Sequence, residues 1–211
     1  MSESYKLVYF DLHGLGEPMR LLCADNDIKI DDKRVSFEEW KSLKPSMTFG
    51  QLPCLCIGEH CQIVQSGAII RHLARKHNLY GENECDMAYC DMFYDGIRDL
   101  HSKYTTIIYR NYDGKADFVA NELPVQLDFM DKLLKTRNDG KAYVLGGDKM
   151  CFVDYVLFEE LHVLQRMDAN CLDKFPTLKA FYDRVKARPS LQAYLTSDNF
   201  VKKPLNGNGK E

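Results

Sequence analysis

The chain has 211 residues, 45% of them hydrophobic, and its 28 basic and 31 acidic side chains give a formal net charge of -3. This length allows one large domain or two small ones, with enough apolar residues for a sizeable core. The small negative charge gives no electrostatic reason to expect a nucleic acid or an anionic membrane as a partner. No apolar run approaches the length of a membrane span, and the first ten residues, which include Glu3, are not expected to act as a signal peptide.

The first part of the chain predicts alternating strands and helices. Residues 5–10 (YKLVYF) are typical of a buried strand, and Pro18 fits the first turn of a helix that follows a glycine-containing loop. Residues 29–35 indicate a weaker strand. Ser36 then precedes a second helix, with Glu39 at the position that completes a capping box.

A hairpin is expected next. The apolar run 52–57 contains Pro53, Gly58-Glu59 reads as a two-residue turn, and Ile63 and Val64 follow it. Because proline removes a donor from the strand ladder, it belongs at an edge or at the start of a strand. We therefore expect an edge strand whose backbone could pair with an extended peptide ligand.

A helix follows the hairpin. Ile69, Ile70, Leu73 and Ala74 fall on one apolar face, and Ser66 stands where the helix needs an N-cap. The N–H groups at the start of this helix would accept a carboxylate. On these residues alone, the alternative is a structural hairpin followed by a well-capped helix without a ligand.

The order of these elements over residues 1–82 is β-α-β-α-β-β-α, which predicts a small α/β domain with helices covering a mixed sheet. After the polar link at 81–84 the strand signals stop, so residues 83–211 predict an all-α domain. Its helical patterns lie at 85–112, 123–134, 153–164 and 178–187. The third of them is nearly all apolar and is expected to be the buried central helix.

The eight cysteines give no reason to expect a disulfide framework, because the chain is long and several of them lie in apolar runs. We interpret them as reduced thiols of a cytoplasmic protein. Cys54, Cys56 and Cys61 raise the alternative of a zinc site, but the chain has no CxxC pair, and no metal is expected.

Four motifs carry a resemblance to a known family: YFDLHGLGEPMRLL (9–22), QLP (51–53), QSGAIIRHLARKHNLYG (65–81) and PLNGNGK (204–210). They resemble the cytosolic glutathione transferases, most closely the pi class, and the match covers essentially the whole chain. The resemblance implies a thioredoxin-like N-terminal domain and an all-helical C-terminal domain that contributes the acceptor-substrate pocket. It also implies conjugation of glutathione to hydrophobic electrophiles, some peroxidase activity, a homodimer, and glutathione as a co-substrate with no cofactor.

The same resemblance assigns roles to residues. Tyr9 would donate a hydrogen bond to the glutathione thiolate, Trp40 and Lys44 would bind its glycine carboxylate, and Asp99 of the second subunit would reach its γ-glutamyl ammonium. The other glutathione contacts would come from Gln51, Leu52, Pro53, Gln65 and Ser66. Without the family, Tyr9 reads as a packing residue, and Trp40 with Lys44 as a surface pair.

The acceptor pocket would be lined by Phe10, Leu15 and Tyr109, although Tyr109 also fits a core aromatic. Leu15 departs from the pi pattern, which commonly has a basic residue there, and Met47 stands where some members have a reactive cysteine.

Two features concern the dimer that the resemblance implies. Phe49, in a loop that a lone domain would expose, is expected to enter a pocket on the partner. Arg71 with Arg75, and Asp91 with Asp95, form pairs at helical spacing. They would meet across the dimer, or alternatively form solvated helix faces.

Two readings of function stay open at this point: a transferase, and a non-catalytic binding protein on the same scaffold. Thiol–disulfide exchange is not expected, because the segment DLHGLGEP has no cysteine. Cys151 stands at a helix start where the related fold normally has Ser or Thr, which predicts a weak cap.

Overall fold

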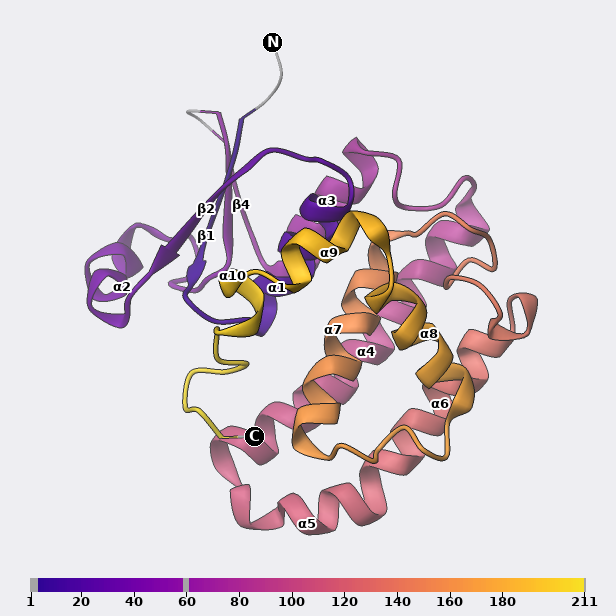
Figure 1. The fold of residues 1–211 in the computed structure, drawn as a ribbon. Coiled ribbons are helices and arrows are strands. Elements are labelled where there is room, and N and C mark those ends of the chain that lie inside the picture. The colour runs from indigo at the N-terminus through magenta and orange to yellow at the C-terminus, as the bar shows by residue number, and fades with distance from the viewer. Residues whose placement is uncertain (1–3, 59–60, 211) are drawn as a thin grey trace. The chain divides into compact units, whose positions relative to one another are not determined.

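The computed structural model describes residues 4–58 and 61–210. The described residues fold into two compact units, one within residues 4–77 together with 189–209 and the other made of residues 78–188 together with 210. Figure 1 shows the path of the chain through its elements. Segment 189–209, which the sequence pattern grouped with the helical domain, thus packs with the first unit.

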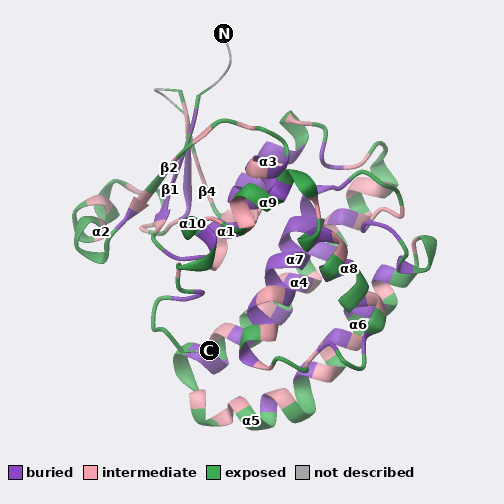
Figure 2. Cartoon of the chain, viewed as in Figure 1, coloured by how far each residue is buried: buried purple, intermediate pink, exposed green. Residues whose placement is uncertain are grey.

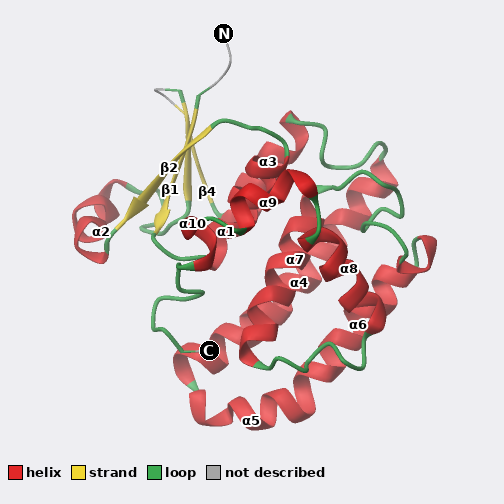
Figure 3. Cartoon of the chain, in the orientation of Figure 1, coloured by secondary structure: helices red, strands yellow, loops and turns green. Residues whose placement is uncertain are grey.

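The first unit is built on a four-stranded sheet of order β2-β1-β3-β4 (Figure 3). Strand β1 (Tyr5–Phe10) pairs with β2 (Ile30–Val35) in parallel and with β3 (Cys54–Ile57) antiparallel. Strand β4 (Cys61–Val64) pairs with β3 antiparallel. The side chains of Leu7, Cys54 and Leu55 are fully buried, so the two inner strands carry the core of the sheet.

Short helices connect and cover these strands. They are η1 (Gly14–Gly16), α1 (Glu17–Asp25), α2 (Phe37–Leu43), η2 (Lys44–Ser46), α3 (Ser66–Lys76), α9 (Pro189–Leu195) and α10 (Asp198–Val201). The expected β-α-β-α-β-β-α order is confirmed, and so is the capping box, in which Ser36 Oγ accepts from the Glu39 N–H.

Helix α9 packs against α1, and the two lie side by side in Figure 1 although they come from opposite ends of the chain. Tyr194 Oη donates a 2.6 Å hydrogen bond to Glu17, and Ser190 Oγ donates to Asp25. His13 contacts the Phe200 carbonyl oxygen through Nε2 at 2.9 Å. These polar contacts with buried partners explain why the C-terminal segment belongs to the first unit.

Two expectations for the hairpin are wrong. Strand β3 lies between β1 and β4, so it is not an edge; Pro53 is tolerated because it stands just before the first paired residue. Ser66 is the first residue of α3 rather than its N-cap, which is Gln65, and Gln65 makes no side-chain capping bond. The expected turn at Gly58-Glu59 lies partly outside the described residues.

The second unit is helical. Its elements are α4 (Glu84–Arg110), η3 (Tyr112–Gly114), α5 (Lys115–Asp117), η4 (Phe118–Glu122), α6 (Leu123–Lys135), η5 (Asn138–Gly140), α7 (Phe152–Met167) and α8 (Pro176–Lys186). Helix α7 is the expected central helix: it packs on α4 and α8, and Figure 2 shows it buried over most of its length. Among the described residues, no helix is both long and apolar enough to cross a membrane.

The start of α7 is a buried polar cluster. Asp154 accepts 2.8 Å hydrogen bonds from the backbone N–H groups of Val144 and Cys151, and Cys151 completes a capping box with its thiol. Burial raises the pKa of Asp154 to about 6, although these two backbone donors act in the opposite direction. The Phe152 N–H donates to the Leu79 carbonyl at 2.8 Å, which ties the segment before α4 to the start of α7.

Candidate functional site

Tyr9 is the next-to-last residue of β1, and its side chain is 7% exposed. Its hydroxyl oxygen accepts a 3.0 Å hydrogen bond from the Leu15 backbone N–H. Accepting this bond uses a lone pair of the phenol oxygen and does not involve the phenol's own O–H group. The end of β1 and the loop after it therefore hold the phenol in one position.

Two glycines let this loop close over the Tyr9 ring. A Cβ on Gly14 would lie 2.6 Å from Tyr9 Oη, and a Cβ on Gly16 would lie 2.5 Å from Tyr9 Cδ1. Gly14 also has a φ of +43°, which side chains rarely adopt. The sequence motif G-x-G here thus serves close packing around Tyr9.

Arg20 holds the same loop through hydrogen bonds to its backbone. Its guanidinium, almost completely buried, donates to the carbonyls of Leu12 (2.7 Å) and Phe10 (3.3 Å) and pairs with Glu17 and Asp32. Burial alone would lower the pKa of Arg20, but the two carboxylates raise it above its ordinary value. Since the carbonyls of Leu12 and Phe10 flank the loop entrance, Arg20 fixes the segment that carries the Leu15 N–H.

A second part of the candidate site is the N-terminus of α3. Gln65 precedes it with φ 73° and ψ 115°, a strained conformation for a residue other than glycine. Its side-chain amide donates a 3.4 Å hydrogen bond to Gln51 Oε1, so Gln51 and Gln65 are brought together. The first N–H groups of the 11-residue helix, beginning at Ser66, can receive an anion.

Leu52 and Pro53 stand between Gln51 and strand β3. The Leu52-Pro53 peptide bond is cis, and the pairing of β1 with β3 begins only at Cys54. The backbone of Leu52 therefore lies outside the sheet ladder. Leu52 directly follows Gln51, which bonds to Gln65. This placement keeps the expected backbone contact of Leu52 available for a peptide-like ligand.

Trp40 and Lys44 lie on and just after α2. Trp40 and Phe37 enclose the ring of Phe10, with centroid distances of 5.8 and 4.9 Å. Phe10 thus packs on α2 in the first unit, where it forms an aromatic wall. The aliphatic part of the Lys44 side chain lies beside Gly50: a Cβ on Gly50 would be 3.5 Å from Lys44 Cε.

The remaining sequence-predicted residues are distributed over both units. In the first unit, Leu15 contributes the N–H that holds Tyr9, Phe49 is 63% exposed, and Arg71 and Arg75 lie on α3. In the second, Asp91, Asp95, Asp99 and Tyr109 lie on α4. Tyr109 is 52% exposed, so the alternative of a core aromatic is wrong. Asp91 accepts a 2.7 Å hydrogen bond from Tyr80 Oη of its own unit.

Sequence reasoning missed the supporting residues: Gly14, Gly16 and Arg20 around Tyr9, and the left-handed backbone of Gln65. An arginine within the apolar side of the first helix was the one available signal, since such a buried charge needs partners. Nothing in the sequence signalled the strain at Gln65, because glutamine has no preference for that conformation.

The comparisons with known proteins match this architecture. Residues 6–75 match the family model of the glutathione S-transferase N-terminal domain, and residues 98–198 match that of the C-terminal domain. The chain is 54% identical over 209 residues to a "Glutathione S-transferase" of Dirofilaria immitis, covering 99% of this chain and 100% of that protein. It is 52% identical over 207 residues to "Glutathione S-transferase P" of Caenorhabditis elegans, covering 98% and 99% respectively.

A solved structure agrees as well. The pi-class glutathione S-transferase of Onchocerca volvulus superposes with a TM-score of 0.95 at 52% identity and covers 99% of this chain and 100% of that one. The resemblance to the pi class that the four sequence motifs carry is thereby confirmed, together with the thioredoxin-like N-terminal domain and the helical domain after it. The chain belongs to the glutathione S-transferase family.

Proposed function

We propose that this glutathione transferase conjugates the glutathione thiolate to hydrophobic electrophiles and that Tyr9 stabilises that thiolate. The observation that carries the proposal is the phenol of Tyr9, held by the Leu15 N–H and enclosed by Gly14 and Gly16. A free thiol has a pKa of about 8.5, so little thiolate forms near neutral pH without a hydrogen-bond donor. The phenol O–H is the donor at this place.

The rest of the first unit supplies complementary groups for glutathione. The γ-glutamyl carboxylate is placed on the N-terminus of α3, beside Gln65 and Ser66, where helix N–H groups favour an anion. The backbone of Leu52 pairs with the peptide part of glutathione. Trp40 and Lys44, both donors only, bind the glycine carboxylate. Leu15 contributes no cation to this set, which leaves one fewer charged contact for glutathione.

In the chemical step, the glutathione sulfur forms a bond to the electrophilic carbon, and the leaving group departs with the electron pair of the broken bond. Tyr9 lowers the free energy of the thiolate before the attack. Asp99, expected to reach glutathione in the second subunit, and Tyr109, expected to line the acceptor pocket, come from α4. Reduction of hydroperoxides would use the same activated thiolate.

A homodimer accounts for the apolar side chains that the single chain leaves exposed. Phe49 is 63% exposed in the first unit, and Met92, Val125 and Phe129 are 52%, 49% and 53% exposed on α4 and α6 of the second. Large exposed apolar side chains on two helices that pack against each other are consistent with an interaction surface. We place Phe49 of one subunit on the α4–α6 surface of its partner, with Arg71, Arg75, Asp91 and Asp95 tuning the pairing.

The proposal is tested by turnover of 1-chloro-2,4-dinitrobenzene with and without glutathione. Turnover should require both glutathione and the protein, and it should fall strongly in Tyr9→Phe while glutathione still binds. A protein that binds glutathione but turns over no electrophile of this class would favour the non-catalytic alternative.

A further inference from the structure

Two buried thiols meet in the helical unit, and neither of them is among the residues assigned to glutathione. Cys90 lies in the first half of α4, and Cys151 caps α7. Their Sγ atoms are 3.5 Å apart, and the side chains are 0% and 2% exposed. The two residues are 61 positions apart in the sequence, so only the packing of α4 on α7 brings the thiols together.

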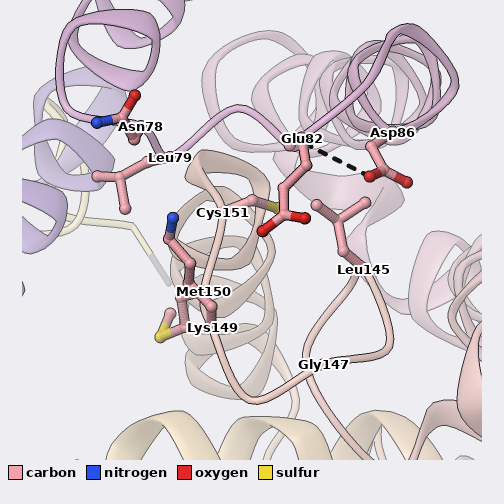
Figure 4. Close-up of a pocket in the computed structure, with 10 residues that line it drawn as sticks. Asn78, Leu79, Glu82, Asp86, Leu145, Gly147, Lys149, Met150 and Cys151 are labelled. Atoms are coloured by element: carbon pink, nitrogen blue, oxygen red, sulfur yellow. Dashed lines mark hydrogen bonds between the residues drawn. The ribbon is translucent and has the colours of Figure 1, made fainter.

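A cavity of about 230 Å³ opens on one of these thiols. Cys151 lines it together with apolar Leu79, Leu145 and Met150, and Figure 4 draws Cys151 in the middle of this lining. Glu82, Asp86 and Lys149 add polar groups to the lining. An apolar cavity of about 150 Å³ suffices to admit benzene, so this one has room for an aromatic ring beside the Cys151 sulfur.

We infer that Cys90 and Cys151 form a two-thiol binding site for monosubstituted trivalent arsenicals, with the organic group of the arsenical in the adjoining cavity. The distance between the two sulfurs selects this ligand class. A trivalent arsenic atom binds two sulfurs at a bent angle, which keeps the sulfurs near contact distance. Two-coordinate mercury or copper(I) prefers sulfurs on opposite sides of the metal and would need a wider gap than 3.5 Å.

The chemistry balances without an oxidant. For an arsine oxide, two S–H bonds and the arsenic–oxygen bond break, and two As–S bonds form. The oxygen leaves as water with the two thiol protons, and arsenic stays trivalent. A disulfide would instead need an oxidant and a sulfur–sulfur distance of about 2.05 Å, which is shorter than the 3.5 Å between the two Sγ atoms here.

Burial makes the site selective. Burial raises the pKa of the Cys151 thiol well above its ordinary value, with the Cys90 thiol and Asp154 acting in the same direction. Ordinary one-bond electrophiles react with thiolates, so they should react first with the exposed thiols of Cys61 and Cys85. An arsenical gains two bonds at once, so it keeps an advantage at this buried pair of thiols.

The chain offers a matched control pair. Cys54 and Cys56 lie on the same side of β3, and their side chains contact each other, so they form a second pair of neighbouring thiols. Cys56 is partly exposed, and the pair comes from a single strand rather than from two helices. If proximity alone decided binding, these two thiols would compete for the arsenical.

The experiment is intact-mass spectrometry of the reduced protein after incubation with one equivalent of phenylarsine oxide in excess glutathione. The wild type should gain one phenylarsine oxide less one water per chain, and 2,3-dimercaptopropanol should remove it. Prior blocking of the exposed thiols with N-ethylmaleimide should leave the occupancy of the arsenical adduct unchanged. The adduct should persist in Cys54→Ala and fall at least tenfold in occupancy in Cys90→Ala and in Cys151→Ser.

Thermal melting of each variant shows whether it is folded. If Cys90→Ala is too unstable, Cys151→Ser decides alone, since its hydroxyl keeps the helix cap. Retention of the adduct in a folded variant that lacks either thiol of the pair overturns the inference. So does loss of the adduct in Cys54→Ala, or its release by glutathione alone.

Discussion

Replacing Tyr9 by phenylalanine removes one hydroxyl and retains the ring that Gly14 and Gly16 enclose. A hydrogen bond to a charged acceptor contributes about 1.5–3 kcal/mol. At about 1.4 kcal/mol per pKa unit, its loss raises the pKa of the bound glutathione thiol by roughly one to two units. Near neutral pH the thiolate fraction then falls by about ten- to a hundredfold, and turnover should fall equally.

The structure adds a second consequence of the same substitution. The Leu15 N–H donates to the phenol oxygen, so Tyr9→Phe leaves that half-buried N–H without this acceptor. The loss of one such bond costs about 1 kcal/mol of stability. We therefore expect a small fall in the free energy of unfolding, and a change of glutathione affinity that is minor compared with the fall in turnover.

The assay is the absorbance of the bound thiolate as a function of pH, in the wild type and in Tyr9→Phe, with turnover measured alongside. The deficit in turnover should shrink as the pH rises, because hydroxide then ionises the thiol without the help of the phenol. Equal titration midpoints together with equal turnover at pH 6.5 would refute the reasoning and leave Tyr9 as a packing residue.

Three further predictions follow from the described contacts. Phe49→Ala should weaken the proposed dimer, because burying such a ring contributes roughly 1.5–3 kcal/mol, and should also reduce glutathione affinity, because Gln51 is two residues away. Sedimentation at low protein concentration measures the dimer, and titration with glutathione measures the affinity. An unchanged sedimentation profile would count against the prediction. Cys151→Ser should raise the free energy of unfolding by roughly 0.5–1 kcal/mol, since a hydroxyl accepts the Asp154 N–H better than a thiol does; a lower urea midpoint would mean that packing against Cys90 dominates. Burial raises the pKa of Asp154 in the folded protein to about 6, from 3.8. The native state therefore binds the proton more tightly than the unfolded state does, and the protonated carboxyl stabilises the fold at low pH. This stabilisation is lost as the pH rises from the unfolded to the folded pKa. The wild type should therefore lose up to roughly 3 kcal/mol relative to Asp154→Asn between about pH 4 and 7, and a pH-independent difference in urea unfolding would contradict this.

Much of the first unit could be predicted because its signals are local. The strand 5–10, the capping box of Ser36 and Glu39, and the hairpin after Pro53 each depend on residues within a few positions of one another. The expected buried helix at 153–164 was equally clear, because an apolar pattern all around a helix leaves no face for solvent. These elements can be predicted from such local patterns without knowing which other elements they pack against.

The errors arise where partners distant in sequence decide the structure. The position of β3 inside the sheet depends on its pairing with β1, whose paired residues lie 46 to 52 positions earlier (54 − 8 and 57 − 5). Proline alone cannot show whether a strand is central or merely begins after it. The packing of α9 on α1 joins Tyr194 to Glu17 across 177 positions. The Cys90–Cys151 contact is of the same kind, and counting cysteines in the sequence could not reveal it.

Gln65 shows how one such distant contact bears on function. The sequence predicted a serine cap because Ser66 precedes an apolar helical face, but a capping serine would turn its own oxygen to the first N–H groups of α3. In the structure the backbone of Gln65 takes a left-handed turn instead, and its side chain bonds to Gln51 rather than to the helix. No side chain of the preceding residue then occupies the helix N-terminus, so its N–H groups remain available for a carboxylate of the ligand. The strain at Gln65 is thus the structural condition for the proposed anion site, which a well-capped helix would have closed.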